Sequence, residues 1–225
     1  SMIVNDAETR IQVGFLAPDN EQNEFWSGMG QFAKSVAEDL NIDLRIVYPS
    51  EGEMFEKEGR MLIDGLSEGA YFITLYEDAR SHRLLQAAEA RNIRSILINT
   101  DVVEKDRKRV GTPRQKLRHW IGHMHPDDVQ AGHEMANLLF QHFEGPNAIR
   151  LIAINGDSNL QLDVDRRTGL QRRMTESPSA TLHQVKEGKW QEATARAVAL
   201  DLMQKYPKVN AIWAASDTMA LGAIA

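Results

Sequence analysis

The strongest constraint on the fold is a segment near the end of the chain, where a short apolar run leads directly into two helix-capping residues. Residues 211–214 read Ala-Ile-Trp-Ala, which is the length and character of a buried parallel strand. Ser216 and Asp217 follow, and both are preferred N-cap residues at the start of a helical pattern. A strand, a polar cap and a helix place side chains at the carboxyl edge of a parallel sheet, where open α/β sheets bind ligands.

The same alternation of strand and helix runs along most of the chain. Short apolar runs predict strands at residues 11–17, 44–48, 71–75, 93–98, 120–123, 148–154, 181–185 and 209–214. Apolar residues at helical spacing predict helices at residues 25–40, 54–66, 81–91, 126–143, 164–175 and 190–206. Strands that alternate with helices over short connections are typical of a doubly wound parallel sheet.

The alternation breaks once, between residues 99 and 118. This stretch is polar, rich in Lys and Arg and without an apolar period, so we expect a long connection without regular structure, of the kind that is functional or a linker. We therefore predict two doubly wound α/β lobes joined by a hinge, an N-terminal lobe at residues 10–125 and a C-terminal lobe at residues 126–225.

Composition excludes several classes of protein. The formal net charge of -6 argues against nucleic-acid binding, which needs a basic patch or stripe. No apolar run approaches the roughly 20 residues of a membrane span. The chain has no cysteine, which removes disulfides, thiolate metal sites and cysteine nucleophiles. Ser1-Met2 is typical of a remnant of recombinant expression, and the missing signal peptide therefore decides nothing.

Two glycine motifs suggest catalysis or nucleotide binding but lack the required context. Residues 28–33 match a dinucleotide fingerprint, yet they lie about ten residues after the predicted strand, on a helix, whereas the motif needs its glycines in the turn. Residues 65–69 match a nucleophile elbow, but they run from helix into strand, the reverse of that motif. We interpret the first glycines as packing positions and the second pair as a helix end and a turn.

Histidines form a loose cluster in the middle of the chain, at His119, His123, His125 and His133. No metalloprotease-type helix motif accompanies them, and a metal site needs ligand geometry as well as ligand count. We therefore expect no metal and no other cofactor.

Polar and aromatic residues directly follow successive predicted strands, where they would project from the carboxyl edges of the sheets. They are Asp19, Asn20, Gln22, Asn23, Phe25 and Trp26 after the first strand, Tyr76, Glu77 and Asp78 after the third, Asn99, Thr100 and Asp101 after the fourth, and Asn155, Gly156, Asp157, Ser158, Ser216 and Asp217 in the second lobe. Two such edges that face each other would line a cleft.

This chemistry suits a polyol. Carboxylates and amides make the paired hydrogen bonds that adjacent hydroxyls present, and aromatic faces such as Phe25 and Trp26 are suited to the apolar side of a sugar ring. Alternatives stay open. Phe25 begins an apolar helical stripe, so core packing explains it equally well, and Asn23 and Ser216 are equally explained as N-caps.

Three short motifs mark a family resemblance. They are Val-Gly-Phe at 13–15 with Asn-Glu-Phe-Trp at 23–26, Arg-Arg-Thr-Gly at 166–169, and Ser-Asp-Thr-Met-Ala-Leu-Gly at 216–222. With these motifs the chain resembles the type I periplasmic sugar-binding proteins, the family of ribose- and galactose-binding proteins. Relatives include autoinducer-2 receptors and the effector domains of LacI-type repressors. The third motif is the most specific, because the family typically carries Asn-Asp-x-Met-Ala-x-Gly there.

The strand-end residues and the resemblance together give the candidate ligand-binding residues, which are Asn23, Phe25, Trp26, Glu77, Asp101, Asp128, Arg166, Ser216 and Asp217. The resemblance implies that Asp101 binds sugar hydroxyls, that Asp128 lies at a hinge crossing, and that Arg166 clamps ring or anomeric oxygens. Ser216 stands where the family usually has a ligand-binding Asn, and a hydroxyl in place of a carboxamide argues against an ordinary hexose or pentose. Trp190 matches a family aromatic, but a core position at a helix start explains it better.

The resemblance implies a periplasmic, non-enzymatic receptor that captures a sugar or sugar-like molecule between two lobes and delivers it to the permease of an ABC transporter. An alternative within this class is a periplasmic sensor protein, which closes on its ligand and transmits that closure to a membrane histidine kinase. We expect a monomer. The alternative class is the ligand-sensing domain of a LacI-type transcription regulator. The family fold normally continues well beyond Gly222, so we expect the second lobe to lack its last part.

Overall fold

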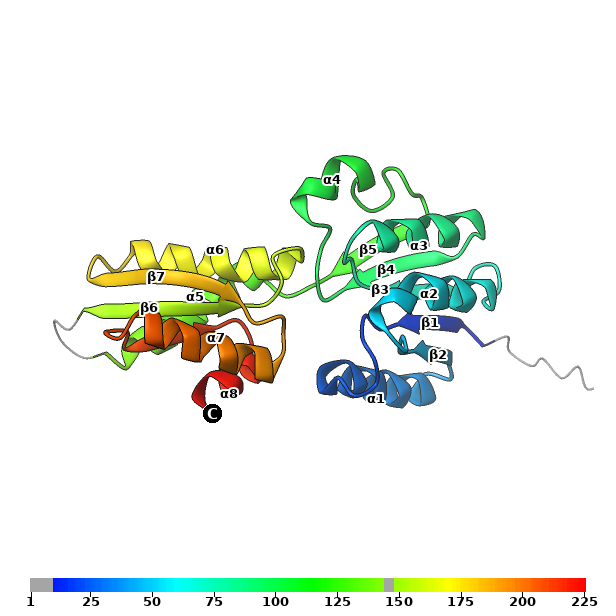
Figure 1. Ribbon diagram of the computed structural model, residues 1–225. Coiled ribbons are helices and arrows are strands. Elements are labelled where there is room, and N and C mark those ends of the chain that lie inside the picture. The colour runs from blue at the N-terminus through cyan, green and yellow to red at the C-terminus, as the bar shows by residue number, and fades with distance from the viewer. Residues whose placement is uncertain (1–9, 144–147) are drawn as a thin grey trace, which may run out of the picture. The chain divides into compact units, whose positions relative to one another are not determined.

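The chain divides into two compact α/β units in the computed structural model, which describes residues 10–143 and 148–225. Unit 1 ends at Met124 and unit 2 begins at His125. Ser1-Met2 lies outside the described residues. Each unit is built around one parallel sheet (Figure 1), which confirms the predicted α/β class. No helix in the described ranges is long and apolar enough to cross a membrane.

Unit 1 is a five-stranded sheet with helices between its strands. Its elements are β1 (Gln12–Leu16), α1 (Glu24–Asp39), β2 (Asp43–Val47), the 3₁₀ turn η1 (Gly52–Met54), α2 (Phe55–Asp64), β3 (Tyr71–Thr74), α3 (Ala79–Ala90), β4 (Arg94–Ile98), α4 (Glu104–Val110) and β5 (Trp120–Met124). All strand pairs are parallel, in the order β2-β1-β3-β4-β5. The direction of winding reverses between β1 and β3, and the carboxyl ends at such a switch point are where open sheets bind ligands.

The two faces of this sheet are covered by different helices because successive strand residues point to opposite faces. Phe15 packs against Trp26 of α1, whereas its neighbour Leu16 packs with Phe55 and Ile63 of α2. The loops after β1 and β3 therefore leave the same edge toward opposite sides. Residues of both loops lie at that edge.

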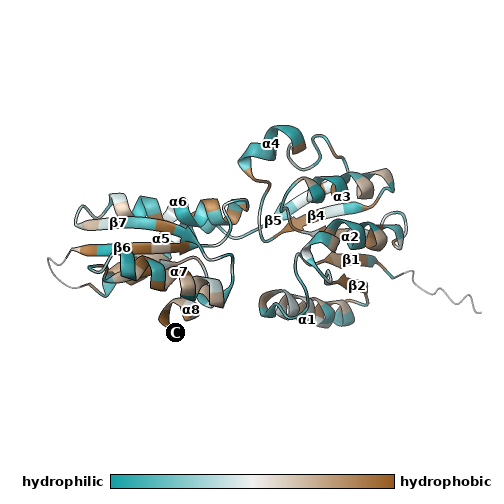
Figure 2. Cartoon of the chain, in the orientation of Figure 1, coloured by the Kyte–Doolittle hydropathy of each residue, from teal (hydrophilic) through white to brown (hydrophobic). Residues whose placement is uncertain are grey.

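Unit 2 is a three-stranded sheet with four helices in the residues that the structure describes. Its elements are α5 (Asp128–Gln141), β6 (Ile149–Asn155), α6 (Gln161–Thr175), β7 (Ala180–Glu187), α7 (Glu192–Lys205), β8 (Ala211–Ala214) and α8 (Asp217–Ile224). Helix α5 packs against α6, and α7 packs against α8. The parallel order is β7-β6-β8. The central strand β6 is almost continuously apolar (Figure 2), and residues 151–154 are fully buried, as expected for a strand that is covered on both faces.

Helices α5 and α6 approach each other closely through two glycines. A Cβ atom on Gly132 would lie 1.9 Å from the backbone oxygen of Arg166, and one on Gly169 would lie 2.0 Å from the backbone oxygen of Val129. Only glycine allows this backbone contact. The contact places the Arg166 side chain within reach of Asp128, the first residue of α5.

The predicted irregular connection at residues 99–118 was wrong, because it contains α4. This seven-residue helix carries acidic residues in its first turn and Arg107, Lys108 and Arg109 in its last turn, a distribution that favours the helix dipole. Its apolar anchors, Val102 and Val110, lie at its ends and are fully buried. No apolar period therefore marked the helix itself.

The predicted helix at residues 25–40 exists, but its apolar stripe is not its buried face. Phe25, Phe32 and Leu40 are 55%, 69% and 65% exposed. The buried positions are Trp26, Gly30 and Ala37. The apolar surface of α1 is wider than the part that contacts the sheet. Phe25 lies outside that contact, so core packing does not explain its position.

Candidate functional site

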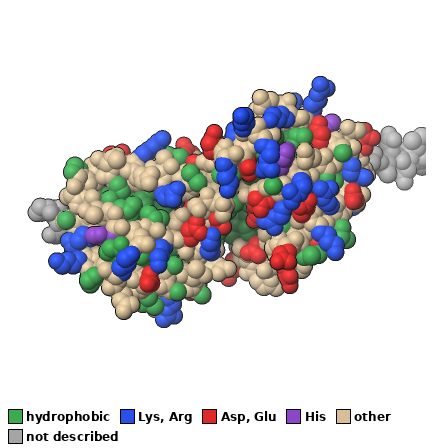
Figure 3. All heavy atoms as spheres, turned by 45° about the horizontal axis from the view of Figure 1, so that its top comes forward, with side chains coloured by type: hydrophobic (Ala, Val, Ile, Leu, Met, Phe, Trp, Pro, Cys, Tyr) green, Lys and Arg blue, Asp and Glu red, His purple; other side chains and the backbone are tan. Residues whose placement is uncertain are grey.

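Polar segments meet at the carboxyl edge of unit 1, which we call edge 1 and define as residues 17–25, 75–78 and 99–103. They follow β1, β3 and β4, three consecutive strands of the sheet. The structure therefore brings the predicted residues Asn23, Phe25, Glu77 and Asp101 to one edge of unit 1. Figure 3 shows acidic and basic side chains interspersed on the face of this unit that it displays.

The first segment of edge 1 presents one exposed aromatic ring. Asn23 is the N-cap of α1 and accepts a hydrogen bond from the Trp26 amide, while its own amide group donates to Asp19 at 2.9 Å. Trp26 lies in the core, with 7% exposure. Phe25 stands edge-on to Trp26 at 5.0 Å between ring centroids. Of the two predicted aromatic residues, Phe25 is the one that offers an exposed face.

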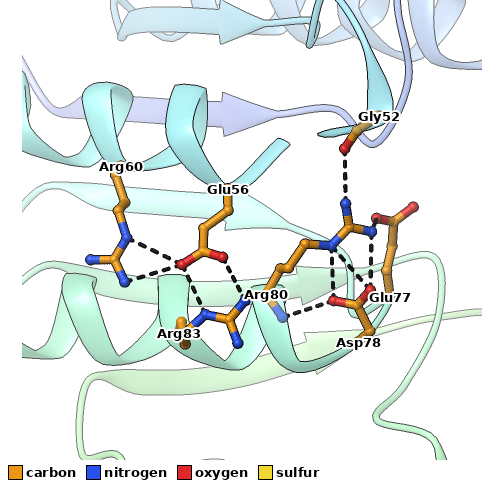
Figure 4. Close-up of polar contacts among 7 residues, drawn as sticks. All are labelled: Gly52, Glu56, Arg60, Glu77, Asp78, Arg80 and Arg83. Atoms are coloured by element: carbon orange, nitrogen blue, oxygen red, sulfur yellow. Dashed lines mark hydrogen bonds and ion pairs between the residues drawn. The ribbon is translucent and has the colours of Figure 1, made fainter. Parts of the chain in front are cut away.

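The second segment is fixed by Arg80. The Arg80 guanidinium pairs with Glu77 at 3.1 Å and with Asp78 at 3.0 Å (Figure 4). Asp78 is also the N-cap of α3 and accepts from the Arg80 amide. Burial alone would raise the pKa of Asp78, but its hydrogen bonds from Arg80 outweigh burial and lower it. Glu77 therefore sits in an ordered ion-pair cluster.

The third segment centres on Asp101, whose carboxylate is held from several directions. Arg107 of α4 donates to both carboxylate oxygens, at 3.2 and 2.6 Å. The Val102 amide and the His123 ring also contact the carboxylate, at 2.6 and 2.8 Å. Burial would raise the pKa of Asp101, but these hydrogen bonds lower it. Asp101 is therefore ionised at neutral pH, and the unpredicted helix α4 supplies its cation.

The Asp101 carboxylate is also part of a group of side chains that could bind a metal ion. The ligand atoms of Asp101, His123 and His125 lie within 4.8 Å of one another. The positive charge of Arg107 on the same carboxylate opposes a bound cation. His133 pairs instead with Glu176, on unit 2. The expectation that these histidines bind no metal remains a prediction.

Unit 2 has a corresponding edge, which we call edge 2 and define as residues 155–158, 187–190 and 214–217. These segments follow β6, β7 and β8. Its first segment is held by Asp163, a fully buried residue that accepts from the Asn155 side chain and the Gly156 amide, both at 2.6 Å. Burial raises the pKa of Asp163 despite these hydrogen bonds. Asp163 of α6 thus fixes the start of the loop after β6.

Asp128 and Arg166 form an ion pair within unit 2. The Arg166 Nε atom lies 2.8 Å from Asp128, whose side chain is only 2% exposed, and Nη1 donates to the Ala215 backbone oxygen at 2.7 Å. Burial raises the pKa of Asp128, while Arg166 acts in the opposite direction. The Asp128 carboxylate is buried in this ion pair. Arg166 has a structural role, because its contacts connect α5, α6 and edge 2. The contact of Asp128 and Arg166 with a ligand stays a prediction.

Trp190 packs against the core of unit 2, which confirms its predicted core position, and it also lies in edge 2, just before α7. Its backbone φ is +60°, next to Lys189 at +54°, and two such non-glycine residues in sequence indicate local strain of the kind found at functional sites. Its ring lies against Gly156, where a Cβ atom would be 2.0 Å from the indole. The Arg166 guanidinium lies 5.9 Å from the ring centroid. Gly156, directly after a strand, is the one sequence signal for such a close approach.

A cation also orders the acidic residues of edge 2. Lys189 pairs with Glu187 and, at 3.3 Å, with Asp157, and Ser158 donates to Glu187. The Lys189 and Ser158 hydrogen bonds lower the pKa of Glu187 to about 2. Sequence reasoning missed Glu187 and Lys189 because no motif marks them.

The last segment of edge 2 shows the predicted helix start. Ser216 is the N-cap of α8 and accepts from the Met219 amide, so the capping interpretation is confirmed for its side chain. Asp217 is exposed and accepts from the Thr218 amide at 3.0 Å. Both residues lie at the carboxyl end of β8, as the strand-cap-helix pattern predicts.

A separate cavity of about 490 Å³ lies in unit 1. Side chains of β2, α2 and their flanks line it, among them Arg45, Lys57 and Met61. None of the predicted site residues is part of its lining. The two edges, rather than this cavity, carry the ordered carboxylates and the aromatic faces.

The model of the periplasmic binding protein domain family matches residues 13–225. A comparison with curated proteins found no match.

Solved structures show the same fold. The chain is similar to a periplasmic sugar-binding protein from Pseudomonas fluorescens, with 29% identity and a TM-score of 0.80, over 95% of this chain and 62% of that one. It is also similar to an ABC transporter periplasmic solute binding protein from Actinobacillus succinogenes 130z with bound D-allose (20% identity, TM-score 0.81, 96% and 72% covered). A third is GanP, a glucose-galactose binding protein from Geobacillus stearothermophilus (19%, 0.76, 95% and 71%). The chain thus spans less than two thirds of the first of these proteins.

Proposed function

Because the chain belongs to the periplasmic binding protein domain family, we propose that it is an extracytoplasmic solute-binding protein for a sugar or sugar-like molecule. In this proposal, polar residues of edge 1 and edge 2 bind one ligand, and the protein delivers it to the permease of an ABC transporter. The protein works as a periplasmic monomer and catalyses no reaction. The solved structures named above bind D-allose or carry sugar-binding names, which supports a small polyol as the ligand.

The observation that carries the proposal is the set of fixed, ionised carboxylates beside exposed aromatic surface at the carboxyl edges. Asp101 at edge 1 and Glu187 at edge 2 each have a lowered pKa because cations and hydrogen-bond donors surround them. Ionised carboxylates accept strong hydrogen bonds from hydroxyl groups. Phe25 adds an exposed ring to edge 1. A preorganised array of acceptors beside an aromatic face favours a polyol over a charged or purely apolar ligand.

A thermal-shift screen over D-allose, D-galactose, D-ribose and glycerol, followed by calorimetric titration, tests the proposal. A ligand at 100 times its Kd stabilises the folded protein by about 2.7 kcal/mol, which raises the Tm by roughly 5 to 10 °C in a chain of this size. Ser216 disfavours an ordinary hexose or pentose, so D-galactose and D-ribose are the reference compounds, and we expect at least one sugar or polyol of a wider screen to produce this shift. If wider screening of sugars and polyols leaves the Tm and the heat signal unchanged, the proposed function is wrong.

Phe25→Ala is the sharpest variant for the same experiment, and Phe32→Ala is its matched control. Both rings are exposed and stand on α1, so either substitution has a small effect on stability. Only Phe25 belongs to edge 1. We expect Phe25→Ala to raise the Kd for the bound sugar about tenfold through loss of ring stacking, and Phe32→Ala to leave it unchanged. Equal affinity in the two variants would remove Phe25 from the site.

A further inference from the structure

Arg80 joins two segments of unit 1 with one side chain. Its Nε atom donates to both carboxylate oxygens of Asp78, at 3.1 and 3.0 Å. Its Nη2 atom donates to Glu77 at 3.1 Å, and its Nη1 atom donates to the backbone oxygen of Gly52 at 2.8 Å. Figure 4 shows the guanidinium between Gly52 on one side and the two acidic residues on the other. It thereby connects the segment after β2 to the segment after β3.

The geometry of these contacts requires arginine. Each guanidinium nitrogen donates in a different direction, and the planar fork also lies 5.6 Å from the centre of the Phe55 ring. A lysine carries the same charge as a single compact ammonium group and cannot reproduce this fork. Hydrogen bonds from Arg80 to Asp78 accordingly come first among the causes that raise the pKa of Arg80.

Glu77 is held at both its backbone and its side chain. Its amide donates to the Ser81 hydroxyl at 3.0 Å, and Ser81 is fully buried. Its carboxylate meets Arg80, and its side chain is 24% exposed. The peptide is therefore anchored by the core, and Arg80 holds the carboxylate.

Arg83, one turn further along α3, offers a natural contrast. It donates to both carboxylate oxygens of Glu56, at 2.9 and 2.6 Å, and Glu56 also pairs with Arg60. This neighbouring cluster, also drawn in Figure 4, links α2 to α3 along their lengths. The Arg83 side chain donates to Glu56 on α2 rather than to a residue of edge 1, and it is 45% exposed, against 31% for Arg80.

We propose that Arg80 is a positioning residue that sets the affinity of edge 1 by fixing the Glu77 carboxylate and the segment around Gly52. The proposal rests on the proposed function, since it assigns Glu77 to the sugar site. Arg80 acts through Glu77 and does not itself touch the sugar. Rigid placement of an acceptor before binding removes an ordering cost that would otherwise weaken the complex.

Calorimetric titration of Arg80→Lys and Arg83→Lys, with the sugar that stabilises the wild type most in the thermal-shift screen, tests this. We expect both variants to fold with similar Tm values. Only Arg80→Lys should raise the Kd, by about tenfold, the effect of losing a hydrogen bond to a charged group. An unchanged Kd in Arg80→Lys, or an equal rise in Arg83→Lys, would overturn the proposal.

A double-mutant cycle with Glu77→Gln separates positioning from a general effect on folding. If Arg80 acts through Glu77, then Arg80→Lys should change the Kd far less in the Glu77→Gln protein than in the wild type. Additive effects of the two substitutions would contradict this role.

Hydrogen exchange in the sugar-free protein keeps the inference testable even if no sugar binds. We expect the amides of residues 50–54 and 77–81 to exchange faster in Arg80→Lys than in Arg83→Lys, because Arg80 ties these two segments together. Equal exchange would refute the positioning role by itself. Failure of every sugar in the screen, with altered exchange in Arg80→Lys, would refute the proposed function and leave the structural role of Arg80 in place.

Discussion

Asp163 shows how one buried side chain shapes a whole edge. It is fully buried, yet it accepts hydrogen bonds from the Asn155 side chain and from the Gly156 amide. Gly156 in turn provides the surface on which the Trp190 ring lies. A buried carboxylate is costly unless its hydrogen bonds are satisfied, so its presence indicates that the position of this loop matters.

Asp163→Ala should lower the free energy of unfolding by about 2 to 3 kcal/mol, because it leaves two buried donors without an acceptor. Asp165→Ala is the control on the same helix. The Asp165 carboxylate accepts a hydrogen bond from Gln161, one turn away, and its loss should cost less than about 0.5 kcal/mol. Urea unfolding of the two variants measures the difference. A loss of the same size for both would show that Asp163 does not hold the loop.

At the residue level, sequence reasoning located positions better than partners. It placed Asp101, Asp128 and Ser216 at strand or helix ends, because the strand-cap-helix pattern fixes where such residues fall. It could not show that Arg107 pairs with Asp101 or that Arg166 supports Asp128, since these contacts depend on tertiary packing. Trp190 was predicted as a core residue at a helix start, and its contact with the core of unit 2 confirms this, but its left-handed backbone and its contact with Gly156 could not be predicted from helical periodicity.

The close contact of α5 and α6 is the feature at the scale of elements that most affects edge 2. It depends on Gly132 and Gly169, and it brings Arg166 to Asp128. Any side chain at Gly132 would displace the Arg166 backbone. This displacement would also move the Arg166 side chain away from Asp128.

Gly132→Ala should therefore destabilise the protein by about 3 kcal/mol, the upper range for overpacking in a rigid contact. Gly28→Ala is the matched control, since it also lies inside a helix but a Cβ atom there meets nothing within 4 Å. The free energy of unfolding of that variant should rise by about 0.5 to 1 kcal/mol, because alanine has a higher helix propensity than glycine. Chemical denaturation decides the matter. If Gly132→Ala is as stable as the wild type, the two helices do not pack as closely as described.

Elements with a clear apolar signal were predicted well, and those without one were not. The buried strand β6 and the capped helix α8 follow directly from their sequences. Helix α4 was missed because six of its seven residues are charged and its one apolar residue, Val110, is its last. The face of α1 was misjudged for the opposite reason. Its apolar arc includes Phe32, which the sheet leaves exposed.

At the scale of the whole molecule, each unit has its own core. The cluster around Leu151 and Trp213 contains only residues of unit 2, and the three other clusters contain only residues of unit 1. The polar edges are therefore separate products of two sheets. A ligand bound by both would couple units whose cores are otherwise independent, which is the basis of hinge closure in two-domain binding proteins.

Hydrogen exchange with and without the best-binding sugar tests this coupling in the intact protein. We expect slower exchange in residues 75–78 and 99–103 of edge 1 and also in residues 155–158 and 187–190 of edge 2, because a ligand that bridges both edges shields and orders both. An epimer that gives no thermal shift serves as the control and should leave exchange unchanged. Protection confined to one unit would mean that a single sheet edge holds the sugar, and the two-edge site would then be wrong even though sugar binding itself was real.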